Sequence, residues 1–128
     1  MHDTPAQPVF DAMVDSARNL VRTRFAGKIT AAGMQGAVIK VETLLPNLKP
    51  GFTALTDFSK VVSMDLDCVP HLTKIMDLCR AHGIGTIIRV LPEPSRDIGI
   101  NLLSIVHYRG KVRRMTVETL EEAERALS

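Results

Sequence analysis

Hydrophobic and polar positions follow two different periods along the first half of this chain. In residues 20–29 apolar and polar side chains alternate singly, which predicts a half-solvated strand near a sheet edge. In residues 31–45 apolar side chains recur every three or four positions, which predicts a helix. Thr30 is placed to cap that helix, and Pro46 ends it. A preceding strand over residues 9–14 would complete an N-terminal hairpin.

The stretch from Gly51 to Pro92 predicts a strand, a helix and a second strand. Residues 52–58 form a short apolar run, and residues 86–91 are apolar and β-branched, as buried strands are. Between the two runs, apolar residues at helical spacing predict a helix whose inward side carries Leu72, Ile75, Met76 and Cys79. Asp65 and Asp67 could cap this helix, and Gly83 and Gly85 end it. Two strands joined in this way lie parallel, with a right-handed crossover.

The last third of the chain predicts a short helix over residues 98–106, a strand over residues 111–117 and a final helix. Thr119 and Glu122 have the spacing of a capping box at the start of that helix. Its inward side would carry Leu120, Ala123 and Leu127. The order β-β-α-β-α-β-α-β-α predicts an α/β fold, with a mainly parallel or mixed sheet of about five strands and about four helices packed on it.

Length and composition are typical of one globular domain. The chain has 128 residues, which we divide into a flexible N-terminal segment, 1–8, and a single domain, 9–128. Its net charge of +2 argues against a nucleic-acid partner. No apolar run reaches the ~18 residues of a membrane span, and the first ten residues do not resemble a signal peptide.

The two cysteines are predicted to be free thiols. Cys68 and Cys79 lie eleven positions apart on one predicted helix, which separates them by ~16 Å. A disulfide needs Cα atoms within roughly 7 Å of each other, so these two cannot pair. Free thiols suit a reducing compartment, and the sequence therefore predicts a cytoplasmic protein.

Three segments together resemble the STAS domain family, which is found in sulfate transporters and anti-sigma-factor antagonists. The segments are VRTRFAGKITAAGM, TDFSKVVSMDLDC and TVETLEEAERAL, and the resemblance covers roughly residues 20–128. It implies a STAS-like sheet and a non-enzymatic regulatory module without a cofactor. It also implies a protein partner, such as a regulatory kinase or an anti-sigma-like protein.

The turn after the third strand departs from the family pattern. In bacterial antagonists this turn carries Asp, Ser, Ser or Thr, and Gly, and a partner kinase phosphorylates the second hydroxyl residue. A helix N-terminus stabilises the added negative charge. Here Asp65 matches the family Asp, Leu66 and Asp67 occupy the hydroxyl positions, and Cys68 occupies the Gly position. The resemblance therefore implies a partner-binding module that lacks the usual phosphorylatable residue.

The expected partner surface combines this turn with the first turns of the following helix. Its residues are Thr30, Ser63, Asp65, Leu66, Asp67, Cys68, His71 and Lys74. Asp67, His71 and Lys74 would form one stripe on the helix. Two simpler interpretations stay open, because the aspartates could serve only as helix caps and the stripe could be an ordinary solvated face.

Basic residues near the last strand suggest a possible anion-binding site. The candidates are Arg89, Arg109, Lys111 and Arg113, and Arg114 belongs to the same run. Parallel sheets bind ligands beyond the carboxyl ends of their strands. The alternative is a charged edge strand that deters pairing with other chains.

No catalytic or metal site is predicted. His82 lies three residues after Cys79, but no further ligand pair has recognisable spacing. A second function, small-molecule or lipid binding of the SEC14/STAS-like type, would use an apolar pocket lined by Met34, Met64 and Met76. An exposed edge strand near residues 9–14 would also allow a homodimer.

Overall fold

The computed structural model of the protein describes residues 10–91 and 112–127. It contains one five-stranded sheet in the order β1-β2-β3-β4-β5. The strands are β1 (Phe10–Asp15), β2 (Leu20–Ile29), β3 (Thr53–Met64), β4 (Thr86–Val90) and β5 (Arg113–Val117). β1 pairs with β2 in the antiparallel sense, and the other neighbours are parallel. The predicted α/β fold with a mixed sheet of five strands is confirmed.

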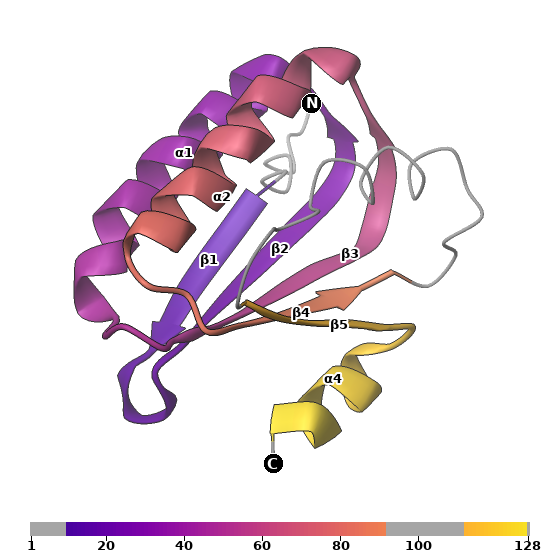
Figure 1. Ribbon diagram of the computed structural model, residues 1–128. Helices are drawn as coiled ribbons and strands as arrows, with labels where there is room; N and C mark the ends of the chain where they lie inside the picture. Colours follow the sequence, from indigo (N-terminus) through magenta and orange to yellow (C-terminus); the bar gives the residue numbers. More distant parts are fainter. Residues whose placement is uncertain (1–9, 92–111, 128) are drawn as a thin grey trace, which may run out of the picture.

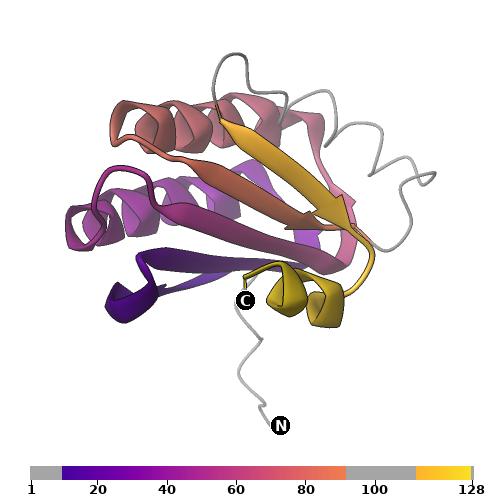
Figure 2. The ribbon, with the colours of Figure 1, turned by 60° about the horizontal axis from the view of Figure 1, so that its bottom comes forward.

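Helices cover both faces of this sheet. The described residues contain α1 (Ala31–Leu44), α2 (Val69–Ala81) and α4 (Leu120–Leu127). α1 and α2 lie side by side on one face, and α4 lies on the other (Figures 1 and 2). The predicted segment 1–8 and the predicted helix over residues 98–106 lie outside the described residues. Among the residues that the structure describes, no helix is both long enough and apolar enough to span a bilayer.

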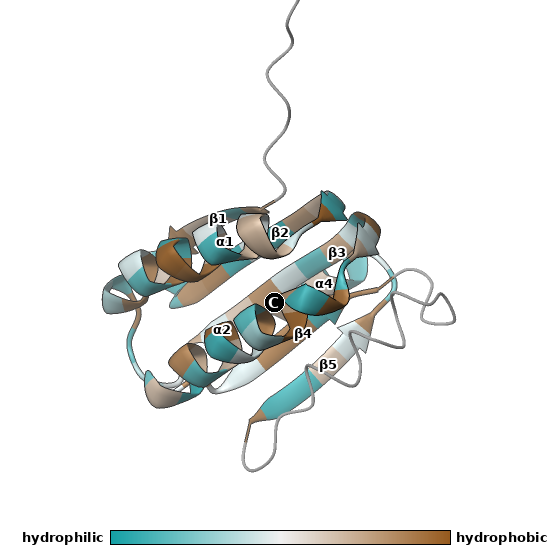
Figure 3. Ribbon diagram, turned by 90° about the horizontal axis from the view of Figure 1, so that it is seen from above, coloured by the Kyte–Doolittle hydropathy of each residue, from teal (hydrophilic) through white to brown (hydrophobic). Residues whose placement is uncertain are grey.

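α1 begins where its sequence predicts and ends at Leu44, one residue before the predicted end, where the 3-10 turn Leu45–Asn47 follows. The Thr30 hydroxyl accepts a hydrogen bond from the Gly33 amide at 3.3 Å, which confirms the predicted cap. Both helices on this face carry hydrophilic and hydrophobic residues side by side (Figure 3). Their buried residues are Met34, Ala37 and Val41 on α1 and Leu72 and Cys79 on α2. These side chains form the core with the sheet face beneath them.

β3 is longer than the sequence predicts. We expected a strand over residues 52–58, but β3 continues to Met64. Ser59 and Lys60 hide the continuation, because they interrupt the apolar run. β4 pairs only with the first part of β3, residues 53–57, while β2 follows β3 to its end through two register shifts. Backbone pairing with β2 therefore extends the strand where hydrophobic periodicity does not predict it.

α4 packs on its own sheet face through fewer residues than predicted. Thr119 accepts a hydrogen bond from the Glu122 amide at 3.1 Å, as expected for a capping residue. Ala123 is fully buried and Leu127 packs against the same cluster. The predicted inward position of Leu120 is wrong, because this side chain is 44% exposed. Leu120 lies in the first turn of the helix, where the chain has just left β5.

An ion pair ties α4 to β2. The Arg22 guanidinium donates a hydrogen bond to the Glu124 carboxylate. This bond lowers the pKa of Glu124 below its ordinary value of 4.5. The pKa of Glu124 is lower in the folded protein than in the unfolded chain. The ion pair therefore stabilises the fold at pH values above the ordinary pKa of 4.5. The contribution is lost as the pH falls through the lowered pKa.

Glu124→Gln is therefore expected to lower the free energy of unfolding near neutral pH by less than about 1 kcal/mol. The difference from the unmodified protein should shrink as the pH is lowered from about 7 towards about 3. Urea unfolding at several pH values measures this difference in the free energy of unfolding. Glu42→Gln, at an exposed position of α1, is the matched control and should show no such trend. A constant deficit of Glu124→Gln across this range would contradict the assignment.

Candidate functional site

The turn that joins β3 to α2 is anchored to the end of β2. The Asp65 amide donates a hydrogen bond to the Ile29 carbonyl oxygen at 3.1 Å. The Cys68 thiol reaches the same oxygen at 3.5 Å, and the Cys68 amide bonds the Asp65 carbonyl oxygen at 3.0 Å. These contacts place the turn next to Thr30, the first residue after β2. Thr30, which the predicted partner surface includes, therefore lies beside this turn.

The residues between these anchors face outward. Leu66 is 71% exposed, and Asp65 and Asp67 on either side of it are exposed as well. Leu66 is one of five large hydrophobic side chains that are exposed among the described residues, the others being Met13, Ile39, Val62 and Leu120. Leu66 has the largest exposed fraction of the five.

The expected capping role of the two aspartates is wrong. Neither the short 3-10 turn Leu66–Cys68 nor α2 has a side-chain cap hydrogen bond at its start. The 3-10 turn delays the start of α2 to Val69, so Cys68 and not an aspartate precedes the helix. Pro70 in the first turn lacks an amide hydrogen and needs no capping partner. Helix capping thus does not account for the two carboxylates.

Cys68 is an anchor of the turn and not a contact residue. Its side chain is 0% exposed and packs in the core with Ile29 and Met34. Burial, followed by the negative charge of Asp65, raises the pKa of the Cys68 thiol. Burial also raises the pKa of Cys79 to about 11. Both cysteines are free, as predicted, and both remain protonated near neutral pH.

The other predicted surface residues differ in how much of them a partner could reach. Lys74 is exposed on α2, while His71 is half-buried one turn before it. Ser63 is half-buried and pairs with Lys28 across the strands. Thr30 is exposed, but its hydroxyl is engaged with the amide of Gly33. The accessible part of the predicted surface therefore centres on Asp65, Leu66, Asp67 and Lys74.

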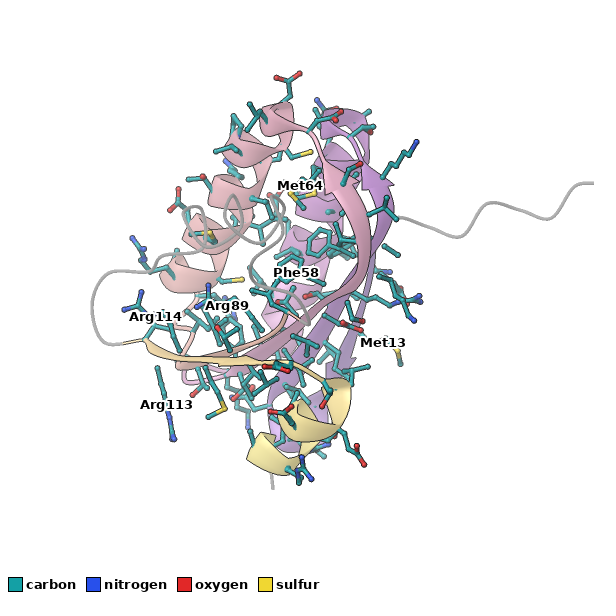
Figure 4. All side chains as sticks on the ribbon, turned by 90° about the vertical axis from the view of Figure 1, so that its right-hand side faces the viewer. Met13, Phe58, Met64, Arg89, Arg113 and Arg114 are labelled. Carbon is teal, nitrogen blue, oxygen red and sulfur yellow. The ribbon has the colours of Figure 1, made fainter. Side chains whose placement is uncertain are left out.

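Of the described arginines of the suggested anion site, Arg89 and Arg113 lie on opposite faces of the sheet. Arg89 is buried on β4 and lies on the sheet face that α1 and α2 cover. Arg113 and Arg114 are adjacent on β5 and point to opposite faces, so Arg114 lies on the side of Arg89 and Arg113 does not (Figure 4). Successive side chains of a strand alternate in this way. Arg109 and Lys111 lie outside the described residues.

A small apolar cavity lies between the sheet and the two helices α1 and α2. Its volume is about 70 Å³. The predicted methionine-lined pocket is only partly correct, because Met76 lines the cavity while Met34 and Met64 belong to the neighbouring core. Figure 4 shows Met64 farther along β3 than Phe58, which does line the cavity. The aromatic side chains of the wall were missed, since they come from three strands and meet only once the register is known.

Within residues 10–91 and 112–127, no group of three or more His, Cys, Asp or Glu side chains could hold a metal ion.

Solved structures with the same architecture define the class of fold. The structure of the anti-sigma factor antagonist SpoIIAA in its unphosphorylated form matches with a TM-score of 0.62 and 20% identity, over 92% of this chain and 96% of that chain. The phosphorylated form of the Bacillus cell fate determinant SpoIIAA matches with a TM-score of 0.59 and 20% identity, over 93% and 99%. The protein thus has a SpoIIAA-like, or STAS, fold, as the sequence resemblance implies.

A third structure widens this class. An uncharacterized protein of the DUF3478 family from Shewanella loihica, with a SpoIIAA-like fold, matches with a TM-score of 0.65 and 12% identity, over 99% of this chain and 100% of that chain. No protein-family model matches the sequence, and no curated protein matches it. At these identities the shared property is the fold.

Proposed function

We propose that the protein is a non-enzymatic regulatory module of the cytoplasm that binds another protein. The binding surface is the turn over residues 63–68 together with the exposed side of the first turns of α2. The partner is a regulatory kinase or an anti-sigma-like protein. The SpoIIAA-like fold supports this proposal, because two of the matching structures are of an anti-sigma factor antagonist.

The observation that carries the proposal is the exposure of Leu66 between two carboxylates. Interfaces derive most of their affinity from a few central side chains surrounded by contacts that exclude water. Leu66 has the exposure of such a contact, and Asp65 and Asp67 would select a partner pocket with a basic rim. The hydrogen bonds to the Ile29 carbonyl oxygen hold the turn in one conformation, so little entropy is lost when it binds.

The composition of the turn also implies how this binding is regulated. The positions of the family's two hydroxyl residues are occupied by Leu66 and Asp67, so phosphorylation at these two positions does not switch the surface. Asp67 carries one permanent negative charge, less than that of a phosphate. We therefore propose constitutive binding through this turn, with regulation exerted on the partner.

Leu66→Glu is expected to abolish capture of the partner. The test is affinity purification from extracts of the source organism, followed by intact mass spectrometry and titration of the purified partner. Loss of a central apolar contact should weaken binding by at least about thirtyfold, and Asp67→Arg should also weaken it.

Ile39→Glu is the matched control. Ile39 is 65% exposed on α1, and the same change of charge is made there. Circular dichroism must show that all variants keep the fold. The proposal is wrong if Leu66→Glu and Ile39→Glu bind the partner equally well, or if no protein is captured.

A further inference from the structure

The cavity beneath α1 and α2 has a wall that selects one kind of ligand. Three phenylalanines line it, with Phe10 and Phe25 rings 4.9 Å apart and Phe25 and Phe58 rings stacked at 5.3 Å. Aliphatic side chains of both helices, such as Val41 and Leu72, complete the wall. Among the described residues, no charged side chain lines the cavity. An ionised group would lose its hydration there without a counter-charge, so the cavity excludes ions.

Two hydroxyl groups give this apolar wall a single polar point. Thr23 and Thr56 lie opposite each other on β2 and β3, and both line the cavity. The Thr23 hydroxyl donates a hydrogen bond to the Thr56 hydroxyl at 2.9 Å. Each hydroxyl has one proton and two lone pairs, so this bond leaves one proton and further lone pairs for a ligand. The pair can therefore donate to a carbonyl group or accept from a hydroxyl group.

The size of the cavity limits the ligand. A volume of about 70 Å³ is roughly that of two water molecules in the liquid and about half of an apolar cavity that admits benzene or xenon. Well-packed cores contain few voids larger than a water molecule. Six of the lining residues are half-buried, namely Phe10, Thr23, Leu44, Thr56, Ile75 and Met76.

We propose that this cavity is a binding site for a small uncharged molecule that has a short alkyl body and one hydroxyl or carbonyl group. The alkyl body lies against the three phenylalanines, and the oxygen lies on the Thr23 and Thr56 pair. This site is separate from the proposed partner surface, and neither proposal depends on the other.

The test uses three probes on the full chain: xenon, 1-propanol and propionate. Side-chain methyl resonances of Val21, Val41, Leu72 and Ile75 are followed by NMR. Xenon and 1-propanol should shift these resonances saturably. Propionate, which has the same chain length and a negative charge, should not shift them. Thr56→Val keeps the shape of the side chain and removes its hydroxyl group. This variant should weaken the binding of 1-propanol by about fivefold and leave the binding of xenon unchanged.

Cavity-filling variants provide the second arm. Ala54→Val and Val41→Leu each add atoms to the cavity wall, and either one that folds should abolish the shifts caused by both xenon and 1-propanol. Ala32→Val, at an exposed position of α1, is the control and should bind as the unmodified protein does. The proposal is overturned if xenon and 1-propanol leave the four residues unshifted, if their shifts persist in the filled variants, or if propionate binds as well as 1-propanol.

Discussion

Gly85→Ala is expected to destabilise the protein by about 2 to 3 kcal/mol, because the added methyl group meets backbone that cannot move aside. A Cβ atom at this position would lie 2.9 Å from the Gly51 carbonyl oxygen and 3.1 Å from its carbon. The two segments are bound to each other there. The Gly51 amide donates to the Gly83 carbonyl oxygen at 2.7 Å, and the Gly85 amide donates to the Phe52 carbonyl oxygen at 2.9 Å.

Gly36→Ala is the matched control for this prediction. Gly36 lies inside α1, and an added Cβ would meet nothing within 4 Å. Since alanine favours helices more than glycine does, this variant should be more stable than the unmodified protein by about 0.5 to 1 kcal/mol. Urea unfolding measures both variants. Gly85→Ala should lower the urea midpoint of unfolding, while Gly36→Ala should raise it slightly. If Gly85→Ala does not lower the midpoint, the close approach at Gly51 has been misassigned.

Phe58→Ala is expected to lower the free energy of unfolding by about 3 to 5 kcal/mol. Phe58 is 5% exposed, and its ring stacks on that of Phe25 at 5.3 Å. It also lines the cavity, so truncation enlarges an existing void. Neighbouring side chains cannot easily fill the larger space, because the sheet holds one side of it and two helices hold the other.

Phe58→Leu distinguishes the contribution of filled volume to stability from the contribution of the aromatic ring itself. Leucine fills much of the same volume, so this variant should lose only about 1 kcal/mol. Urea unfolding again gives both values. A cost of Phe58→Ala below that of Phe58→Leu would show that the ring does not support the core as described.

Signals that act over a few residues explain which parts of the fold could be predicted. The alternation in residues 20–29 coincides with β2, and the helical spacing after Thr30 coincides with α1. The Thr30 cap depends on a donor only three residues away. Glycines at the end of α2 act through their own backbone, and Gly83 adopts a positive φ of 92° there. The order of these elements sufficed to predict an α/β fold, and the resemblance of three segments to the STAS family implied the STAS-like sheet.

The candidate site could be located but not described from the sequence. Its position follows from the end of a strand and the start of a helix, both of which are local features. Whether an aspartate caps that helix depends on the 3-10 turn Leu66–Cys68, which moves the start of α2 to Val69. The exposure of Leu66 depends on what packs against it, and hydrophobicity alone predicts the opposite.

The sequence by itself determined the order of strands and helices, the capping of α1 and the residues that can form a core, because each follows from interactions within one or two helical turns. Tertiary structure alone decided the length of β3, the outward position of Leu120 and the divergence of Arg89 and Arg113. It also decided the cavity. Thr23 and Thr56 are 33 residues apart and meet only through the β2–β3 register. Such contacts depend on pairing between distant segments, which no local periodicity encodes.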